Sequence, residues 1–291
     1  MNIGVTIHAT DETMDPVELA REAEARGYHS FYIPEHTHIP TSRETPAPTG
    51  TPELGREYLR TLDPYIALAA AGAVTDRILL GTGIGLVAQH DPITFAKELA
   101  TLDRLCGGRF VFGIGYGWNR EEMRNHGIDY ATRRELVRER LIAMQSLWSQ
   151  ERASFSGQYV NFEESWSWPK PIQQPRPRTL IGGAPGPKLF AAIAELADGW
   201  LPIGGAGMKA ALDQLRAAYE RAGRDPARMH VVPFGVLPEA GKLEYYRELG
   251  VTETVLRLPS AGRDAVLPVL DDFTSWLERY ADQADSANSA E

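Results

Sequence analysis

Features that mark several large classes of protein are missing from this 291-residue sequence. It has a single cysteine, Cys106, so no intramolecular disulfide can form and nothing indicates an oxidising compartment. No run of 18 apolar residues is present, and the opening residues MNIGVTIHAT carry no basic segment ahead of an apolar core. We therefore expect a cytoplasmic protein with no membrane partner.

Basic residues are fewer than acidic ones: the sequence has 30 Lys and Arg residues and 39 Asp and Glu residues, which gives a net charge of −9. Nucleic-acid surfaces need clustered Lys and Arg, so we expect no nucleic-acid partner. A local basic pocket for an anionic cofactor is still compatible with this balance. The hydrophobic share of 43% is ordinary for a globular protein that buries a large core.

The most informative stretch is DPITFAKELATLDRLCGGRFVFGIGYGW, residues 91–118. Apolar residues in its first half are spaced as on one face of a helix, which Gly107 and Gly108 then end because glycine accepts the left-handed conformation. Residues 109–114 are apolar, branched and aromatic and predict a buried strand. A glycine-rich exit, 115–117, follows this strand and lets the backbone approach a flat or phosphorylated ligand closely.

Similar strand-like runs recur along the chain and alternate with helical stretches. We predict eight strands, at residues 2–7, 30–34, 78–83, 109–114, 179–182, 199–203, 230–236 and 254–258. Eight strands alternating with helices predict a parallel sheet closed into a (β/α)8 TIM barrel, with an open doubly wound sheet as the alternative. We expect one domain over residues 1–281, and a disordered tail over the small polar residues 282–291.

Two insertions exceed a minimal barrel. Residues 37–60, rich in Pro, Thr and Gly, follow strand 2, and residues 154–178 lie between the fourth helix and strand 5. Long loops inside a compact domain are usually functional or disordered. Trp166 and Trp168 argue against disorder in the second insertion, because such rings seek burial.

Active sites of such barrels lie at the carboxyl ends of the strands. The polar side chains expected there are His8, Glu35, His36, His38, Gln89 and His90. His36 and His38 resemble a pair of metal ligands, but strands 4, 5 and 6 end in glycine, aromatic residues and proline, so we expect no metal site. All five lysines fall in predicted helices or loops, which argues against a Schiff-base enzyme.

Glycine-rich exits at three neighbouring strand ends suit a flat ring lying against bare backbone, although each glycine alone could merely turn the chain. The segment GGAPGPK, residues 182–188, leads from a strand into a helix N-terminus. Free amides, the helix dipole and Lys188 make it a potential phosphate site, and the alternative is an ordinary turn with a solvated lysine.

The ordered motifs IPEHTHIP, LGTGI, DPITFAKELATLDRLCGGRFVFGIGYGWN, WPKPIQQP, LIGGAPGP and ADGWLP resemble the luciferase-like monooxygenase superfamily, in its branch that uses the deazaflavin coenzyme F420. The resemblance is strong over residues 1–202 and continues weakly to the last helix. It implies the luciferase-like (β/α)8 barrel, with the deazaflavin or flavin ring at the carboxyl end of the strands.

The resemblance also implies roles for particular residues. A non-proline cis peptide is expected at Gly83–Ile84, with Thr82–Gly83 as second choice. His36 matches the histidine beside the reacting edge of the ring and is the expected acid/base, and Glu35 is expected to orient it, although adjacent residues on an extended chain point opposite ways. The segments around the ribityl chain and phosphate correspond to Gly115, Tyr116, Gly117, Gly182, Gly183, Ala184 and Lys188.

Two departures from the family bear on the ligands. Tyr116 stands where some flavin-binding relatives have a phosphate-binding arginine, and Trp118 stands where deazaflavin-dependent sugar-phosphate dehydrogenases have a catalytic acid. The second departure favours a less polar substrate. We expect residues 37–60 to cover the substrate side, and Trp118, Trp166 and Trp168 to bind an apolar or aromatic substrate.

The resemblance thus implies an oxidoreductase that transfers a hydride between coenzyme F420 and an unidentified organic molecule. The alternatives are a two-component FMN-dependent monooxygenase, like luciferase or alkanesulfonate monooxygenase, supplied with reduced cofactor by a separate reductase, or a flavin-binding protein without turnover. Family members pair through outer helices, so a homodimer is also expected.

Overall fold

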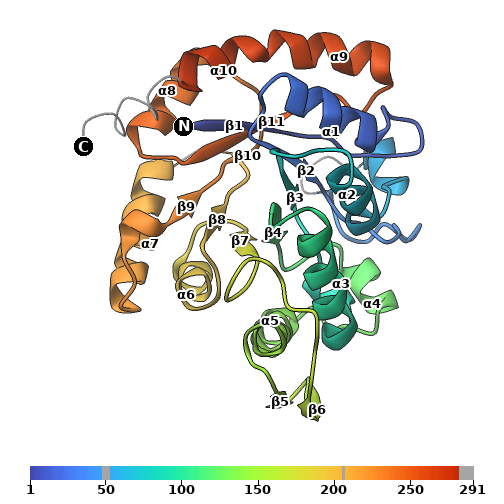
Figure 1. Ribbon diagram of the computed structural model, residues 1–291, viewed down its shortest axis with the longest axis vertical. Coiled ribbons are helices and arrows are strands. Elements are labelled where there is room, and N and C mark those ends of the chain that lie inside the picture. The colour runs from blue at the N-terminus through green and yellow to red at the C-terminus, as the bar shows by residue number, and fades with distance from the viewer. Residues whose placement is uncertain (48–52, 205–206, 282–291) are drawn as a thin grey trace.

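The computed structural model describes residues 1–47, 53–204 and 207–281; the predicted disordered tail, 282–291, lies outside this range. A curled parallel sheet forms the centre of the molecule (Figure 1). Its strands are β1 (Asn2–Thr6), β2 (Ser30–Ile33), β3 (Leu79–Thr82), β4 (Phe110–Ile114), β7 (Arg178–Gly182), β8 (Gly199–Leu201), β9 (His230–Val231), β10 (Phe234–Val236) and β11 (Glu253–Arg257). They are hydrogen-bonded in the order β10-β11-β1-β2-β3-β4-β7-β8-β9.

Each predicted strand is present, and the predicted strand 230–236 forms both β9 and β10, which are separated at Val232 and Pro233. This segment meets both ends of the sheet. The amide of Val232 donates to the carbonyl of Trp200 in β8, and the amide of Val255 in β11 donates to the carbonyl of Pro233, each at 2.9 Å. The sheet therefore curls round until its two ends meet in one segment, in contrast to the open sheet considered as the alternative.

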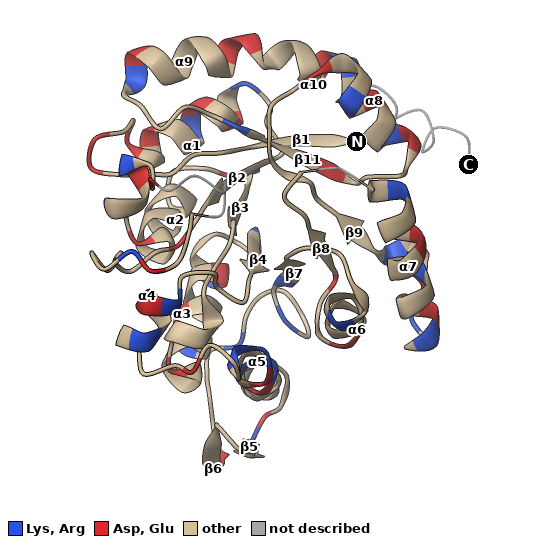
Figure 2. Ribbon diagram, turned by 180° about the vertical axis from the view of Figure 1, so that it is seen from behind, with Lys and Arg blue, Asp and Glu red and all other residues tan. Residues whose placement is uncertain are grey.

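Helices surround the sheet (Figure 1). They are α1 (Pro16–Ala25), α2 (Pro64–Gly72), α3 (Pro92–Leu105), α4 (Arg120–Asn125), α5 (Arg133–Ser149), α6 (Pro187–Leu196), α7 (Met208–Arg221), α8 (Ala240–Glu248), α9 (Arg263–Asp272) and α10 (Thr274–Ala281). Short 3-10 turns are η1 (Arg56–Leu59), η2 (Val87–Gln89) and η3 (Pro226–Arg228). Figure 2 shows acidic and basic residues mixed along the outer helices, with few on the strands. Within the described ranges, no helix combines the length and apolar character needed to cross a bilayer.

An Asp-Pro pair starts each of the first three helices. Asp15, Asp63 and Asp91 precede prolines that are the first residues of α1, α2 and α3, and each carboxylate accepts a hydrogen bond from a backbone amide of the first turn. Aspartate satisfies amides that have no partner inside the helix, and proline has no amide to satisfy. Local sequence therefore fixes where these helices begin.

An antiparallel hairpin of β5 (Ala153–Ser156) and β6 (Asn161–Ser165) lies between α5 and β7 and projects beyond α5 (Figure 1). The rings of Trp166 and Trp168, cited above as seeking burial, have exposed fractions of 70% and 57%. Each ring instead lies on the outer surface beside a cation, Arg152 for Trp166 and Lys170 for Trp168. These cation–π contacts stabilise rings that lie outside the core.

Inside the curled sheet lies a small apolar cluster formed by Tyr32, Val111, Leu180, Leu201, Val232 and Val255. A buried carboxyl, Glu253 at the start of β11, accepts a hydrogen bond from the hydroxyl of Ser30 in β2. Burial raises the pKa of Glu253 to about 7, against the opposing effects of Ser30 and Arg178. This carboxyl lies at the amino-terminal end of β11, away from the loops that follow the strands.

Candidate functional site

The loops that follow β1, β2, β3, β4 and β7 emerge at one edge of the sheet, because these strands are parallel neighbours. This edge carries most of the residues singled out in the sequence, which we call the ligand edge. His8 follows β1, His36 follows β2, and Gly83, Gly115 and Gly183 follow β3, β4 and β7.

His36 pairs with Glu122, an acid of helix α4. Its Nδ1 atom lies 2.9 Å from Oε2 of Glu122, and the two side chains are only 7% and 2% exposed. The side chain of Asn119 caps α4 by accepting the amide of Glu122. Sequence reasoning missed Glu122, although a helix-capping residue followed three positions later by Glu is a known start signal for a helix.

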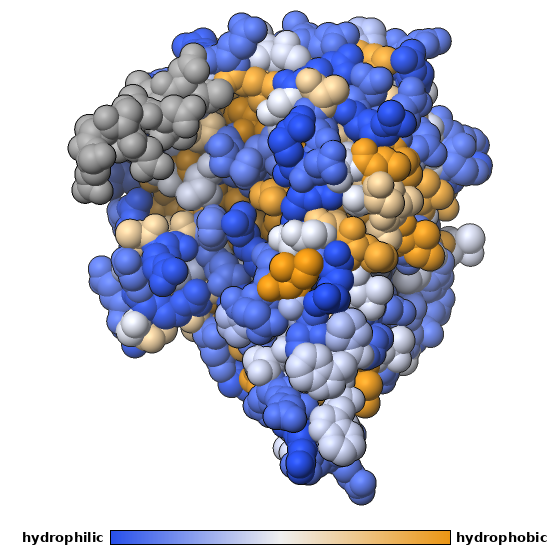
Figure 3. Space-filling model, viewed as in Figure 1, coloured by the Kyte–Doolittle hydropathy of each residue, from blue (hydrophilic) through white to orange (hydrophobic). Residues whose placement is uncertain are grey.

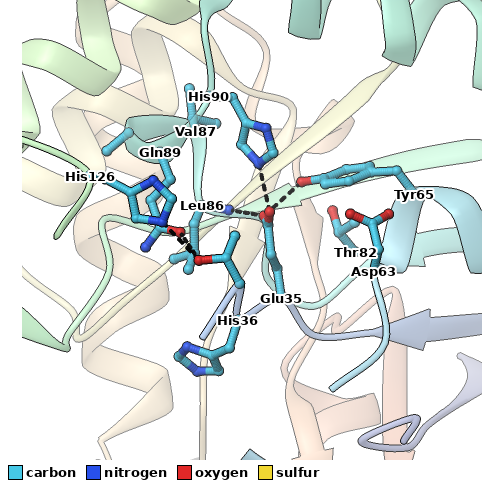
Figure 4. Close-up of polar contacts among 12 residues, drawn as sticks. Glu35, His36, Asp63, Tyr65, Thr82, Leu86, Val87, Gln89, His90 and His126 are labelled. Atoms are coloured by element: carbon cyan, nitrogen blue, oxygen red, sulfur yellow. Dashed lines mark hydrogen bonds and ion pairs between the residues drawn. The ribbon is translucent and has the colours of Figure 1, made fainter. Parts of the chain in front are cut away.

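Glu35 does not orient His36, so that expectation is wrong. Its carboxylate accepts hydrogen bonds from the hydroxyl of Tyr65 at 2.9 Å and the amide of Leu86 at 2.6 Å, and it lies 2.6 Å from Nε2 of His90 (Figure 4). The figure shows the His36 ring turned away from this cluster. Glu35 and His36 diverge because successive side chains of an extended chain point to opposite sides. Through its contacts with Leu86 and His90, Glu35 ties the end of β2 to the loop after β3.

Aromatic rings flank His36. The centroids of Tyr58 and Trp118 lie 5.6 and 5.7 Å from that of His36, and Tyr58 also lies 4.7 Å from His8. Tyr58 belongs to η1, within the insertion 37–60, so the described part of that insertion places a ring against His36; residues 48–52 lie outside the description. Burial lowers the pKa of His8 to about 4, which keeps this ring neutral near pH 7.

The peptide bond between Gly83 and Ile84 is cis, as the resemblance implied. The glycines around it make room for apolar side chains of this chain. A Cβ atom on Gly83 would lie 2.2 Å from the ring of Phe234, and one on Gly115 would lie 2.3 Å from the side chain of Ile84. Ile84 and Phe234 therefore occupy space that we had assigned to a ligand against bare backbone. Both are partly buried and pack against the small apolar cluster inside the curled sheet.

The predicted phosphate segment is open. Gly183 is exposed with a φ of +146°, and its carbonyl accepts a hydrogen bond from the indole of Trp200 at 3.0 Å. No side chain caps the start of α6, and Lys188 in its first turn is exposed. A cation also lies beside the glycine-rich exit of β4, where the guanidinium of Arg134 is 4.3 Å from the ring centre of Tyr116.

The remaining predicted residues are not all brought together. Trp118 lies beside His36, but among the described residues Trp166 and Trp168 have no ring contact with this group, so their assignment to the same substrate site is corrected. The hydroxyl of Thr82 donates to the carbonyl of Gly113 at 2.7 Å and serves the sheet. In the described ranges, no three His, Cys, Asp or Glu residues are grouped to hold a metal ion.

Comparisons with known proteins support this description. Residues 2–238 match the family model described as luciferase-like monooxygenase. An uncharacterized protein of Mycobacterium tuberculosis is 42% identical over 284 residues, which cover 97% of this chain and 98% of that protein. The F420-dependent glucose-6-phosphate dehydrogenase of Kineococcus radiotolerans is 30% identical over 215 residues, covering 71% of this chain and 58% of that enzyme. An F420-dependent secondary alcohol dehydrogenase, solved with an F420-acetone adduct, shares the fold with a TM-score of 0.75 at 18% identity, covering 94% and 97% of the two chains.

Proposed function

Because this chain belongs to the luciferase-like monooxygenase family, we propose that it is an oxidoreductase that transfers a hydride between coenzyme F420 and an apolar or aromatic alcohol. The observation that carries the proposal is the buried pair of His36 and Glu122, at the edge that also holds the Gly83–Ile84 cis peptide. Relatives named as F420-dependent dehydrogenases support the cofactor and the hydroxyl substrate. We take the curled sheet to be the (β/α)8 barrel of a single cytoplasmic domain, with insertions after β2 and before β7.

The ligand edge fits a flat cofactor with an anionic tail. Ile84 offers an apolar floor, and the uncapped start of α6 with Lys188 offers amides and a cation for a phosphate. Arg134 adds a cation that has no ion pair among the described residues. The residues proposed to line the cofactor are His36, Gly83, Ile84, Gly115, Tyr116, Gly117, Gly182, Gly183, Ala184 and Lys188, whereas Thr82, also predicted there, is fully buried and bonded within the sheet. Bound there, the deazaflavin would supply a two-electron acceptor or donor of hydride.

His36 is the proposed acid/base group. An alcohol that loses a hydride from its carbon must also lose the proton of its hydroxyl, and imidazole exchanges protons near neutral pH. Tyr58 and Trp118 flank the ring and offer aromatic surface to the rest of the substrate. This surface accounts for an apolar or aromatic substrate better than for a sugar phosphate.

Parallel fluorescence titrations of the purified protein with F420 and with FMN test the cofactor assignment. We expect F420 to bind at least about tenfold more tightly than FMN, and its reduced form to be stable in air on the protein. Tighter FMN binding with rapid oxygen uptake would instead support the two-component monooxygenase, which needs a separate reductase. A bound cofactor that no donor reduces would support a flavin-binding protein without turnover.

The variant Gly183→Val should weaken F420 binding at least tenfold, because a branched side chain blocks close approach to the backbone and disfavours positive φ. Gly250→Val is the matched control, since Gly250 also has positive φ but lies before β11 at the opposite edge. We expect similar losses of melting temperature in both variants and a loss of affinity in only one. Unchanged F420 affinity in Gly183→Val would place the phosphate elsewhere.

We also propose a homodimer. Figure 3 shows an apolar patch over α2, and Ile66 of this helix is 74% exposed. Contiguous exposed apolar surface commonly marks a protein–protein contact. Sedimentation velocity at micromolar concentration should give twice the monomer mass, and Ile66→Asp should shift the protein to monomer. A wild-type monomer at that concentration would contradict this expectation.

A further inference from the structure

Two adjacent acids of helix α4 are buried, but they differ in their partners. Glu121 is 4% exposed and accepts hydrogen bonds from both the amide of Thr45, at 2.7 Å, and the hydroxyl of the same residue. Glu122 is 1% exposed and has one partner, His36, at Oε2. No donor among the described residues reaches its Oε1 atom.

A buried carboxylate oxygen without a hydrogen-bond donor lowers the stability of the folded state. The hydrogen bonds from Thr45 offset the cost of burying the Glu121 carboxylate, and they fix this part of the insertion 37–60 to α4. Glu122 has no comparable structural contact apart from His36. The contrast indicates that Glu122 serves the histidine rather than the stability of the fold.

The contact also determines where His36 carries its proton. An ionised carboxylate can only accept hydrogen bonds, so Nδ1 of a neutral His36 must be the donor, and the lone pair then lies on Nε2. No described residue forms a hydrogen bond with Nε2, and the ring lies beside Tyr58 and Trp118. The free nitrogen is thus available to a substrate.

We propose that Glu122 is a positioning residue that holds His36 in the tautomer protonated at Nδ1 and balances its positive charge when Nε2 takes up a proton. This inference rests on the proposed function for its reaction. A deazaflavin held at the ligand edge would supply the hydride acceptor for the alcohol carbon; the hydroxyl proton would pass to Nε2 of His36, and the C–O single bond would become a carbonyl. Glu122 touches neither reactant and acts through His36.

The tautomer can be measured without any cofactor by 15N NMR of protein labelled at histidine. We expect His36 of the wild-type protein to be protonated at Nδ1. In Glu122→Gln the ratio of the Nδ1–H to the Nε2–H form should fall about tenfold or more, because the charge-assisted hydrogen bond is lost. The neutral amide of glutamine can accept a hydrogen bond from Nδ1–H or donate one to an unprotonated Nδ1, so it selects neither tautomer. Glu121→Gln is the matched control, with an unchanged His36 signal.

Stability and turnover separate a positioning role from a structural one. Glu122→Gln should melt at or above the wild-type temperature, whereas Glu121→Gln should melt below it. With secondary alcohols as probe substrates, Glu122→Gln should lower kcat roughly 100-fold with little change in KM or in F420 affinity.

The inference is overturned if Glu122→Gln keeps the wild-type tautomer ratio, or if it melts lower to the same extent as Glu121→Gln. An unchanged kcat would overturn it as well. Failure of the proposed function looks different: the wild-type protein would then bind no F420, while the loss of the Nδ1–H form in the variant would still be observed.

Discussion

Replacing His36 by asparagine should lower kcat about 100- to 10,000-fold, the range that general acid–base catalysis contributes in enzymes. Asparagine cannot exchange a proton near neutral pH, so the hydroxyl proton of an alcohol has no acceptor at this position. F420 affinity should stay within about threefold of wild type, since the proposed phosphate contacts lie at the start of α6. The measurement is the loss of F420 absorbance with a series of aliphatic and aromatic secondary alcohols.

His38→Asn is the matched control, because His38 lies two residues further along the same segment and is exposed. Its ring contacts the hydroxyl of Thr37 and the side-chain amide of Asn125, and has no contact with Tyr58 or Trp118 among the described residues. We expect this variant to keep its kcat. A His36→Asn variant that turns over alcohols at the wild-type rate would remove His36 from the reaction.

The second large effect concerns stability and pH. Glu253→Gln should raise the free energy of unfolding relative to wild type by up to about 3 kcal/mol at pH 8, and by much less at pH 5. Burial raises the pKa of Glu253 from 4.5 to about 7 in the folded state. A carboxyl whose folded pKa is raised contributes stability that is fully present below pH 4.5 and is lost as the pH rises through 7.

Urea titrations of both proteins between pH 5 and 8 would give this difference directly. The comparison with wild type is needed because two buried histidines make stability depend on pH in the opposite sense. Burial lowers the pKa of His8 and of His29 to about 4, so the stability that these neutral side chains contribute to the folded state is lost as the pH falls. Glu220→Gln, at an exposed position of α7, is the control and should show no pH-dependent difference. A constant difference between Glu253→Gln and wild type across this range would mean that Glu253 does not titrate there.

Local sequence signals predicted the elements that frame the ligand edge. The alternation of strands and helices and the glycine exits are short-range patterns, because hydrogen bonding and backbone conformation within a few residues decide them. The Gly83–Ile84 cis peptide was implied by the resemblance to a family, and the structure agrees with it, whereas the ring contact between His36 and Trp118 was not predicted.

Tertiary structure decided which side chains meet. His36 and Glu122 lie 86 residues apart, and Ser30 and Glu253 lie 223 apart, so both pairs depend on strand order and register, which no local pattern specifies. The glycines predicted a close approach, but whether a ligand or Ile84 fills the space depends on packing across the sheet. The exposure of Trp166 has the same origin, since burial of a ring is decided by what the rest of the chain leaves uncovered.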